Sequence, residues 1–147
     1  MSGGEIEVRR RLPAPVTEVF AWWTDPERMA QWLSPVGTAE ATVDLRVGGS
    51  FRVVMRGAGM EIEHTGEYLE IEPPRRLVFT WRSPYTGPEP SLVTVELEPD
   101  GDGTALRLLH GQLPEGAAAS HAEGWGQMLG RLAGVMHEQR GMTWQST

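Results

Sequence analysis

Residues 121–139 of the chain read HAEGWGQMLGRLAGVMHEQ, and this stretch decides the fold. Its apolar side chains recur every three or four residues, which predicts a helix with one apolar face. That face contains Ala122, Trp125, Met128, Leu129, Leu132, Ala133 and Met136. We predict a helix over about residues 115–139, roughly 35 Å long at about 1.5 Å per residue. It is the one long helix that the sequence predicts.

The residues before this helix follow a different period. Between residues 38 and 111, apolar and polar side chains alternate, which predicts strands. The predicted strands span residues 39–47, 50–56, 61–71, 76–82, 92–98 and 104–110. Glycine and proline turns separate most of them, and short connections favour antiparallel pairing. A further strand is predicted at residues 5–12, followed by two short helices that begin at Pro15 and at Asp25-Pro26.

A sheet of seven antiparallel strands cannot cover its own apolar face, whereas a long amphipathic helix lying across it can. We therefore predict an α+β fold in which a curved seven-stranded antiparallel sheet wraps around the C-terminal helix. Residues 1–147 are expected to form a single domain with an ordered core over about residues 5–139. Such a sheet often leaves a hollow beneath its helix, and concave apolar hollows are where small ligands bind.

Composition excludes several classes of function. The chain has 13 basic residues, all arginine, against 20 acidic ones, for a formal net charge of −7. An acidic chain repels phosphate backbones, so no nucleic-acid partner is expected. The chain has no cysteine, so disulfides, thiol nucleophiles and zinc–thiolate sites are ruled out. There is no apolar run of the ~20 residues that span a bilayer and no signal-peptide pattern, so we expect no membrane partner and a cytoplasmic location.

The common catalytic and cofactor motifs do not occur either. The chain has no lysine to complete a phosphate-binding loop, no H-E-x-x-H and no G-x-S-x-G. The four histidines are far apart in sequence. We therefore predict no cofactor and no metal site, and we assign no catalytic residue.

Strand parity indicates which side chains face the hollow, because alternate residues of a strand share a face. The apolar set expected to line it is Phe51, Val53, Met55, Leu77, Phe79, Trp81, Leu108, Trp125 and Leu129. Three polar residues, His64, Tyr68 and His110, share these faces, and Trp32 on the second short helix is expected near the mouth. All of these except Leu77 form the predicted ligand-binding set.

The polar members allow two interpretations. Two imidazoles and a phenol in an apolar hollow could bind a polar group of a ligand or transfer a proton. The same side chains could instead form hydrogen bonds within a packed core.

A row of glycines bears on the oligomeric state. Gly126, Gly130 and Gly134 are spaced four apart on the predicted helix, away from its apolar face. Such a row lets another backbone approach closely, as in membrane helix pairs, which would allow a dimer contact. The alternative is that the row only reflects the glycine-rich composition of the chain, which has 18 glycines. The sequence leaves monomer and homodimer open.

Several stretches together resemble a known family. They are PVTEVF at residues 15–20, WTDPERM at 23–29, QW at 31–32, DLRVGGSF at 44–51 and GEYLEIEPPRRLVFTW at 66–81. The helix adds His121, Gly124-Trp125, Leu129 and Leu132 in the matching order. The chain is similar, over about residues 5–136, to the family named after the activator of heat-shock-protein-90 ATPase. That family lies within the START and birch-pollen-allergen-like (SRPBCC) superfamily.

The resemblance implies the helix-grip fold and a hydrophobic cavity. It implies that the protein binds a small hydrophobic or aromatic molecule between sheet and helix. One alternative is an enzyme like the polyketide cyclases and aromatases of the superfamily, with His64, Tyr68 or His110 as acid and base. Another is a chaperone-linked interaction module. Whether the protein is an enzyme stays open at this stage.

Overall fold

The computed structural model describes residues 5–34, 37–57, 59–86 and 89–145. Within these residues it contains seven strands and three helices. In chain order they are β1 (Ile6–Leu12), α1 (Val16–Thr24), α2 (Pro26–Met29), β2 (Thr38–Val43), β3 (Ser50–Gly57), β4 (Met60–Glu72), β5 (Arg76–Trp81), β6 (Ser91–Asp100), β7 (Gly103–Gly111) and α3 (Ala118–Gln145).

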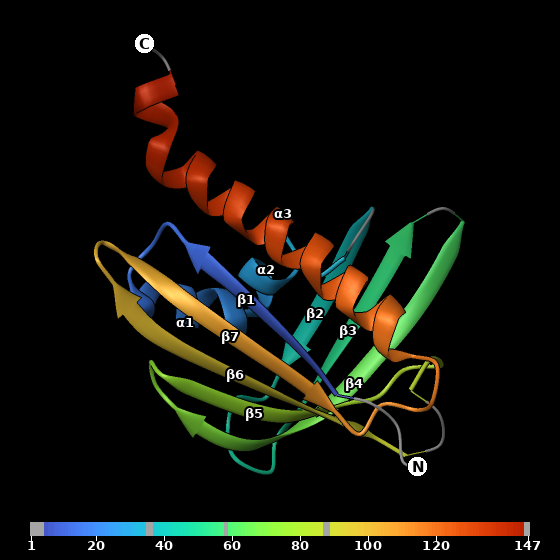
Figure 1. Ribbon diagram of the computed structural model, residues 1–147. Coiled ribbons are helices and arrows are strands. Elements are labelled where there is room, and N and C mark those ends of the chain that lie inside the picture. Colours follow the sequence, from blue (N-terminus) through green and yellow to red (C-terminus); the bar gives the residue numbers. More distant parts are fainter. Residues whose placement is uncertain (1–4, 35–36, 58, 87–88, 146–147) are drawn as a thin grey trace.

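The strands form one antiparallel sheet in the order β1-β7-β6-β5-β4-β3-β2. The sheet curves, and α3 lies across its concave side (Figure 1). The predicted fold class is confirmed: this is an α+β, helix-grip arrangement with a long C-terminal helix and two short helices after the first strand.

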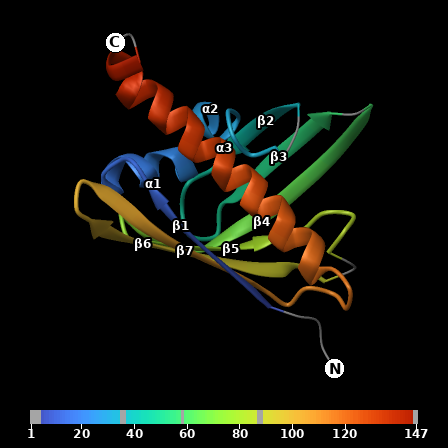
Figure 2. The same ribbon diagram turned by 45° about the horizontal axis from the view of Figure 1, so that its top comes forward.

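The short helices fill one end of the space between sheet and α3. Figure 2 shows α1 and α2 beside α3 at the end away from the tips of β3 and β4. Three indoles enter the core here: Trp22 and Trp23 of α1, and Trp32 in the turn that follows α2, are all almost fully buried. The Trp23 ring is stacked on that of Trp125 with centroids 6.0 Å apart. Because three tryptophans occupy this end, the remaining space lies near the start of α3.

One predicted strand boundary was wrong for a local reason. The strand expected over residues 39–47 ends at Val43, because residues 44–49 form a loop that pairs with β4 instead. In that loop the Gly48 N–H donates to the Tyr68 carbonyl, and the Tyr68 N–H donates to the Gly49 carbonyl, each at 2.9 Å. Gly48 takes a positive φ of 87°, which a side chain would strain.

The long helix is also displaced along the chain. It begins at Ala118 rather than near residue 115, because Gly116 has a φ of 86° and the Ala117 N–H closes a turn on the Pro114 carbonyl. It continues to Gln145 rather than ending at residue 139. The face predicted to be apolar is the one that enters the core, since Trp125, Leu129, Leu132 and Met136 are buried.

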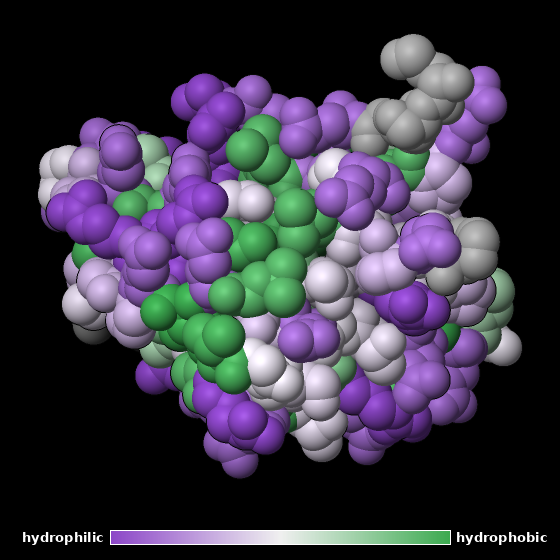
Figure 3. Space-filling model, turned by 90° about the horizontal axis from the view of Figure 1, so that it is seen from below, coloured by the Kyte–Doolittle hydropathy of each residue, from purple (hydrophilic) through white to green (hydrophobic). Residues whose placement is uncertain are grey.

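The outer face of the sheet carries charged side chains that pair across strands. Ion pairs connect Glu7 to Arg107, Arg107 to Glu96, Glu96 to Arg76 and Arg76 to Glu70, across neighbouring strands. Seen from below, the molecule shows a largely hydrophilic surface with a band of hydrophobic residues across it (Figure 3).

The glycine row on α3 lies over open space. An added Cβ at Gly126 or Gly134 would meet no atom within 4 Å, and one at Gly130 would meet only the Arg10 guanidinium at 3.8 Å. We therefore expect the double variant Gly126→Ala/Gly134→Ala to raise the free energy of unfolding by about 0.5–1 kcal/mol per site, because alanine favours the helix. Denaturant unfolding measures this gain.

Light scattering on the same variant tests whether this row forms a homodimer contact, the alternative that the sequence leaves open. If the row packs against a second copy, the added methyl groups should lower the measured mass toward that of the monomer. A stabilised variant with the mass of the wild type would contradict a dimer built on this row.

Candidate functional site

A cavity of about 370 Å³ lies between the start of α3, the β3–β4 hairpin and the segment that follows β5. The hairpin contributes the end of β3 and the beginning of β4. The volume of the cavity is within the range of small-molecule sites. Its walls are largely apolar. They consist of Ser34, Met55, Arg56, Gly57, Met60, Ile62, His64, Trp81, Tyr85, Ser120, His121, Gly124, Trp125 and Met128.

Two indoles form the inner wall. Trp81 is the last residue of β5 and points toward the helix, while Trp125 points from α3 toward the sheet. Their ring centroids are 5.2 Å apart, and only 3% and 1% of the two residues are exposed. Aromatic faces of this kind provide large apolar contact surfaces for a flat ligand.

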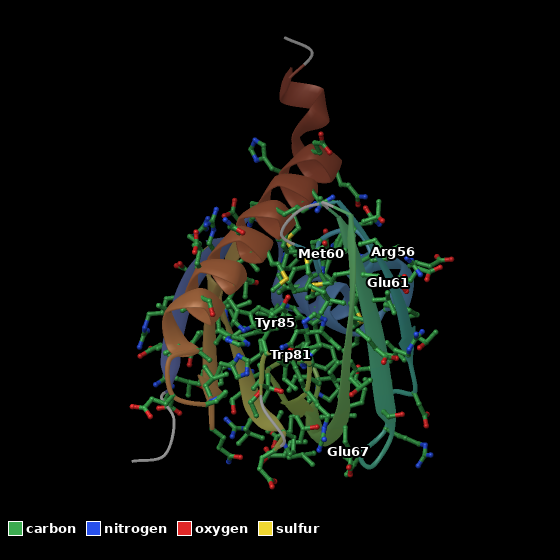
Figure 4. All side chains as sticks on the ribbon, turned by 90° about the vertical axis from the view of Figure 1, so that its right-hand side faces the viewer. Arg56, Met60, Glu61, Glu67, Trp81 and Tyr85 are labelled. Atoms are coloured by element: carbon green, nitrogen blue, oxygen red, sulfur yellow. The ribbon has the colours of Figure 1, made fainter. Side chains whose placement is uncertain are left out.

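Two exposed apolar side chains flank the mouth. Met60, at the beginning of β4, is 54% exposed and Tyr85, in the segment after β5, is 53% exposed. Figure 4 looks between α3 and β4, where Trp81 and Tyr85 lie between the helix and the sheet, with Met60 nearer the end of the hairpin. Exposed apolar side chains of this size at a cavity entrance favour the entry of an apolar ligand.

A buried hydrogen-bond chain connects the Trp125 indole to the backbone of Trp81. The Trp125 Nε1–H donates to Nδ1 of His110 at 2.9 Å, so the proton of the neutral imidazole is on Nε2. That Nε2 lies 2.7 Å from Oγ of Ser91, and the Ser91 hydroxyl donates to the Trp81 carbonyl at 2.6 Å. Both ring nitrogens of His110 are therefore occupied within the core. Burial, together with the charge of His121, lowers the pKa of His110 to about 3.

His64 is the other buried imidazole, and it lines the cavity. It is 7% exposed, and its ring lies 4.8 Å from that of Trp81. Its Nδ1 has no hydrogen-bond partner among the described residues. Burial lowers the pKa of His64 to about 4, and the charge of His121 acts in the same direction, whereas the carbonyls of Ile62 and Val53 oppose the shift. His64 is therefore uncharged near neutral pH.

The first turn of α3 brings a third histidine to the cavity. Nδ1 of His121 lies 2.9 Å from the Ala117 carbonyl, which also accepts from the His121 backbone N–H and from the Ser120 hydroxyl, both at 3.1 Å. The His121 ring meets that of His110 edge to face at 5.1 Å. These contacts hold the imidazole in one orientation at the cavity wall.

The cation at the rim is already paired. Nη1 of Arg56 donates to Glu40 at 2.8 Å and Nη2 donates to Glu61 at 3.3 Å. These carboxylates, through the Glu40 hydrogen bond above all, raise the pKa of Arg56. Figure 4 shows Arg56 and Glu61 together beside the hairpin end. The cluster carries one positive and two negative charges, so the rim does not attract anions.

A second, much smaller void of about 10 Å³ lies deeper in the core. Trp81 and Trp125 contribute to its wall, together with Phe51, Tyr68 and Phe79. Its volume is about that of one water molecule. The Tyr68 hydroxyl and Nε1 of Trp23, which also lines the void, have no hydrogen-bond partner among the described residues. Burial raises the pKa of Tyr68, so the phenol keeps its proton at neutral pH.

The structure divides the predicted ligand-binding set into three groups. Met55, His64, Trp81 and Trp125 meet at the main cavity. Phe51, Tyr68 and Phe79 line the inner void, where aromatic rings fill the centre of the predicted hollow. The third group comprises residues that are buried and line neither space: Trp32, Val53, Leu108, His110 and Leu129.

The placement of Trp32 at a cavity mouth was wrong. Its Nε1–H donates to the Trp22 carbonyl at 3.0 Å, and the side chain has no exposed surface. This bond ties the turn that follows α2 to α1, so the indole is part of the core that closes the opposite end of the space.

Sequence reasoning missed several wall residues. His121 could have been predicted, because it lies four residues before Trp125 and therefore on the same side of the helix. Gly124 and Met128 follow from the same helical spacing. Tyr85 carried no such signal, since it lies in a segment without periodicity.

Two features are absent from the described residues. No group of three or more histidine, aspartate and glutamate side chains is placed so that it could hold a metal ion. Within the same described part of the chain, no helix is long and apolar enough to cross a membrane.

Comparison with known proteins shows the same architecture elsewhere. CalU16 from Micromonospora echinospora is 33% identical, with a TM-score of 0.69 and coverage of 97% of this chain and 86% of that chain. Protein NE0264 from Nitrosomonas europaea is 27% identical, with a TM-score of 0.78 and coverage of 92% and 95%. An HSP90 activator from Plasmodium falciparum is 27% identical, with a TM-score of 0.71 and coverage of 85% and 89%. No curated protein matches the chain significantly.

The chain also matches a protein family over most of its length. Residues 13–137 match the family described as Activator of Hsp90 ATPase homolog 1-like protein. This segment contains both short helices, six of the seven strands and the cavity-lining part of α3. The protein therefore belongs to the Activator of Hsp90 ATPase homolog 1-like family.

Proposed function

We propose that this protein binds a small hydrophobic or aromatic molecule in the cavity between the sheet and α3. The observation that carries the proposal is the cavity of about 370 Å³, with two buried indoles as its inner wall and exposed Met60 and Tyr85 at its mouth. The fold of this family commonly binds hydrophobic ligands. A cavity with apolar walls and few polar groups is typical of such sites.

Gly124 offers a direct way to fill the cavity. It lines the wall, and a Cβ added there would meet no atom within 4 Å. We expect Gly124→Leu to fold normally, because leucine favours a helix, and to weaken binding of the neutral dye Nile red at least about tenfold, since the new side chain occupies the site. Fluorescence titration of the dye measures the dissociation constant.

The matched control is Gly134→Leu, the same change in the same helix at an exposed position with open space around it. It should leave dye binding unchanged. The proposal fails if the wild type does not bind the dye at a single saturable site, or if Gly124→Leu binds it as tightly as Gly134→Leu does.

An enzymatic role, like that of a polyketide cyclase or aromatase, is supported by the imidazoles at the cavity wall. His64 and His121 both line the space, whereas both ring nitrogens of His110 are occupied and Tyr68 lies at the inner void. The acid–base pair of such an enzyme would then be His64 and His121. Conversion of a bound polyketide-type substrate that stops in His64→Phe, with dye binding retained, would favour this role over simple binding.

The third candidate, an interaction module, is supported by exposed apolar residues elsewhere. Leu45, Val47 and Leu69 are 44%, 63% and 41% exposed, and the β2–β3 loop is hydrogen bonded to β4 beside Leu69. One solved relative is an HSP90 activator. Stimulation of a purified Hsp90 ATPase that is lost in Val47→Glu/Leu69→Glu but kept in Gly124→Leu would favour this role.

A further inference from the structure

The His121 imidazole is held in a fixed orientation at the cavity wall, and it presents a hydrogen-bond acceptor. A carbonyl oxygen only accepts, so the contact between Nδ1 of His121 and the Ala117 carbonyl places a proton on Nδ1. In the neutral imidazole the proton is then absent from Nε2, which is left with a lone pair. His121 therefore offers an acceptor at the cavity wall.

Three donors near His121 and at the rim are already engaged within the protein. The Ser120 hydroxyl donates to the same Ala117 carbonyl, which leaves the lone pairs of its Oγ. The Trp125 N–H donates to His110 in the core. The Arg56 guanidinium donates to Glu40 and Glu61. The start of α3 thus presents acceptors, and the charged group at the rim is neutralised.

Neither Arg56 nor His64 offers a free cation to an anionic ligand. Arg56 faces two carboxylates, and His64 is buried to 93% with an unpartnered nitrogen, where a charge would be costly. A carboxylate in this cavity would therefore be desolvated without an ion pair. A hydroxyl group carries no such cost, and it can donate to His121.

We propose that the ligand of this cavity is an uncharged molecule with an aromatic body and a hydroxyl group that donates a hydrogen bond to Nε2 of His121. This rests on the proposed function and adds the ligand's chemical class: a phenol or aromatic alcohol, rather than an aromatic acid or ether. The indoles of Trp81 and Trp125 provide the apolar surface for the aromatic part, and the first turn of α3 provides the acceptor.

Three ligands of nearly the same shape test the proposal: a naphthol, its methyl ether and the corresponding naphthoate, each displacing Nile red from the full-length protein at pH 7.5. The naphthol should bind about fivefold more tightly than its ether, the effect of one neutral hydrogen bond. The naphthoate should bind more weakly than both. In His121→Leu the naphthol and its ether should bind within about twofold of each other, with the affinity for the ether retained.

The control is His137→Leu, an exposed histidine further along the same helix, which should keep the wild-type ranking. Equal binding of naphthol and ether to the wild type, tighter binding of the naphthoate, or an unchanged ranking in His121→Leu would each overturn the inference. These results leave the proposed function standing, because that function fails only if Nile red does not bind or if Gly124→Leu does not weaken it.

Discussion

Replacing Trp125 by alanine is expected to lower the free energy of unfolding by about 3–5 kcal/mol, the usual cost of removing a buried aromatic side chain. Trp125 is 1% exposed and touches the rings of Trp23, Trp81 and His110. Its loss also leaves Nδ1 of His110 without its donor. Chemical denaturation followed by circular dichroism measures the change.

The variant Trp125→Phe separates packing from hydrogen bonding. Phenylalanine keeps much of the ring surface but cannot donate to His110, so we expect a loss of about 1–2 kcal/mol. If Trp125→Ala costs less than about 1 kcal/mol, the helix does not dock on the sheet through this residue, and the cavity wall described above is wrong.

The second large effect is a loss of stability in mild acid. His64 and His110 have pKa values of about 4 and about 3 in the folded protein, against 6.5 for a solvent-exposed histidine. The unfolded chain therefore takes up protons below pH 6.5 that the folded chain does not bind, so acid favours unfolding. Each histidine should remove on the order of 3 kcal/mol between pH 6.5 and pH 4, and neither should change stability above pH 6.5.

The contribution of His110 can be isolated with His110→Asn, whose amide oxygen can accept from Trp125. This variant should be less stable than the wild type at neutral pH, because it loses packing. Its stability should also fall less steeply in acid, with about one proton fewer taken up on unfolding at pH 5. Unfolding curves at several pH values provide the comparison, and parallel pH profiles for the two proteins would refute the assignment of a buried, neutral His110.

Much of the fold followed from periodicity. Strand parity placed Phe51, Val53 and Met55 on the buried face, because successive side chains of a strand point to opposite sides. Helical spacing placed Trp125 against the sheet in the same way. These patterns are local properties of the chain, so the α+β class, the antiparallel sheet and the docking face of the long helix were all predictable from the sequence.

The position of the cavity was decided by the tertiary structure. Parity indicates that a side chain points inward, but it does not say whether the space there is already filled. Three tryptophans, from α1 and the turn that follows α2, fill one end, and the aromatic rings around Phe51 fill the centre. The open space therefore lies at the start of α3. Tyr85 reaches it from a segment with no periodic signal.

The roles of the histidines were likewise set by contacts between segments far apart in sequence. His110 and His64 have similar positions in the strand pattern, yet His110 is bonded on both sides by Ser91 and Trp125, while His64 lines the cavity. The sequence by itself determined which faces are apolar, since that depends on the order of residues along each element. Which polar atom on those faces is satisfied and which is left for a ligand depends on partners that only the folded chain brings within hydrogen-bonding distance.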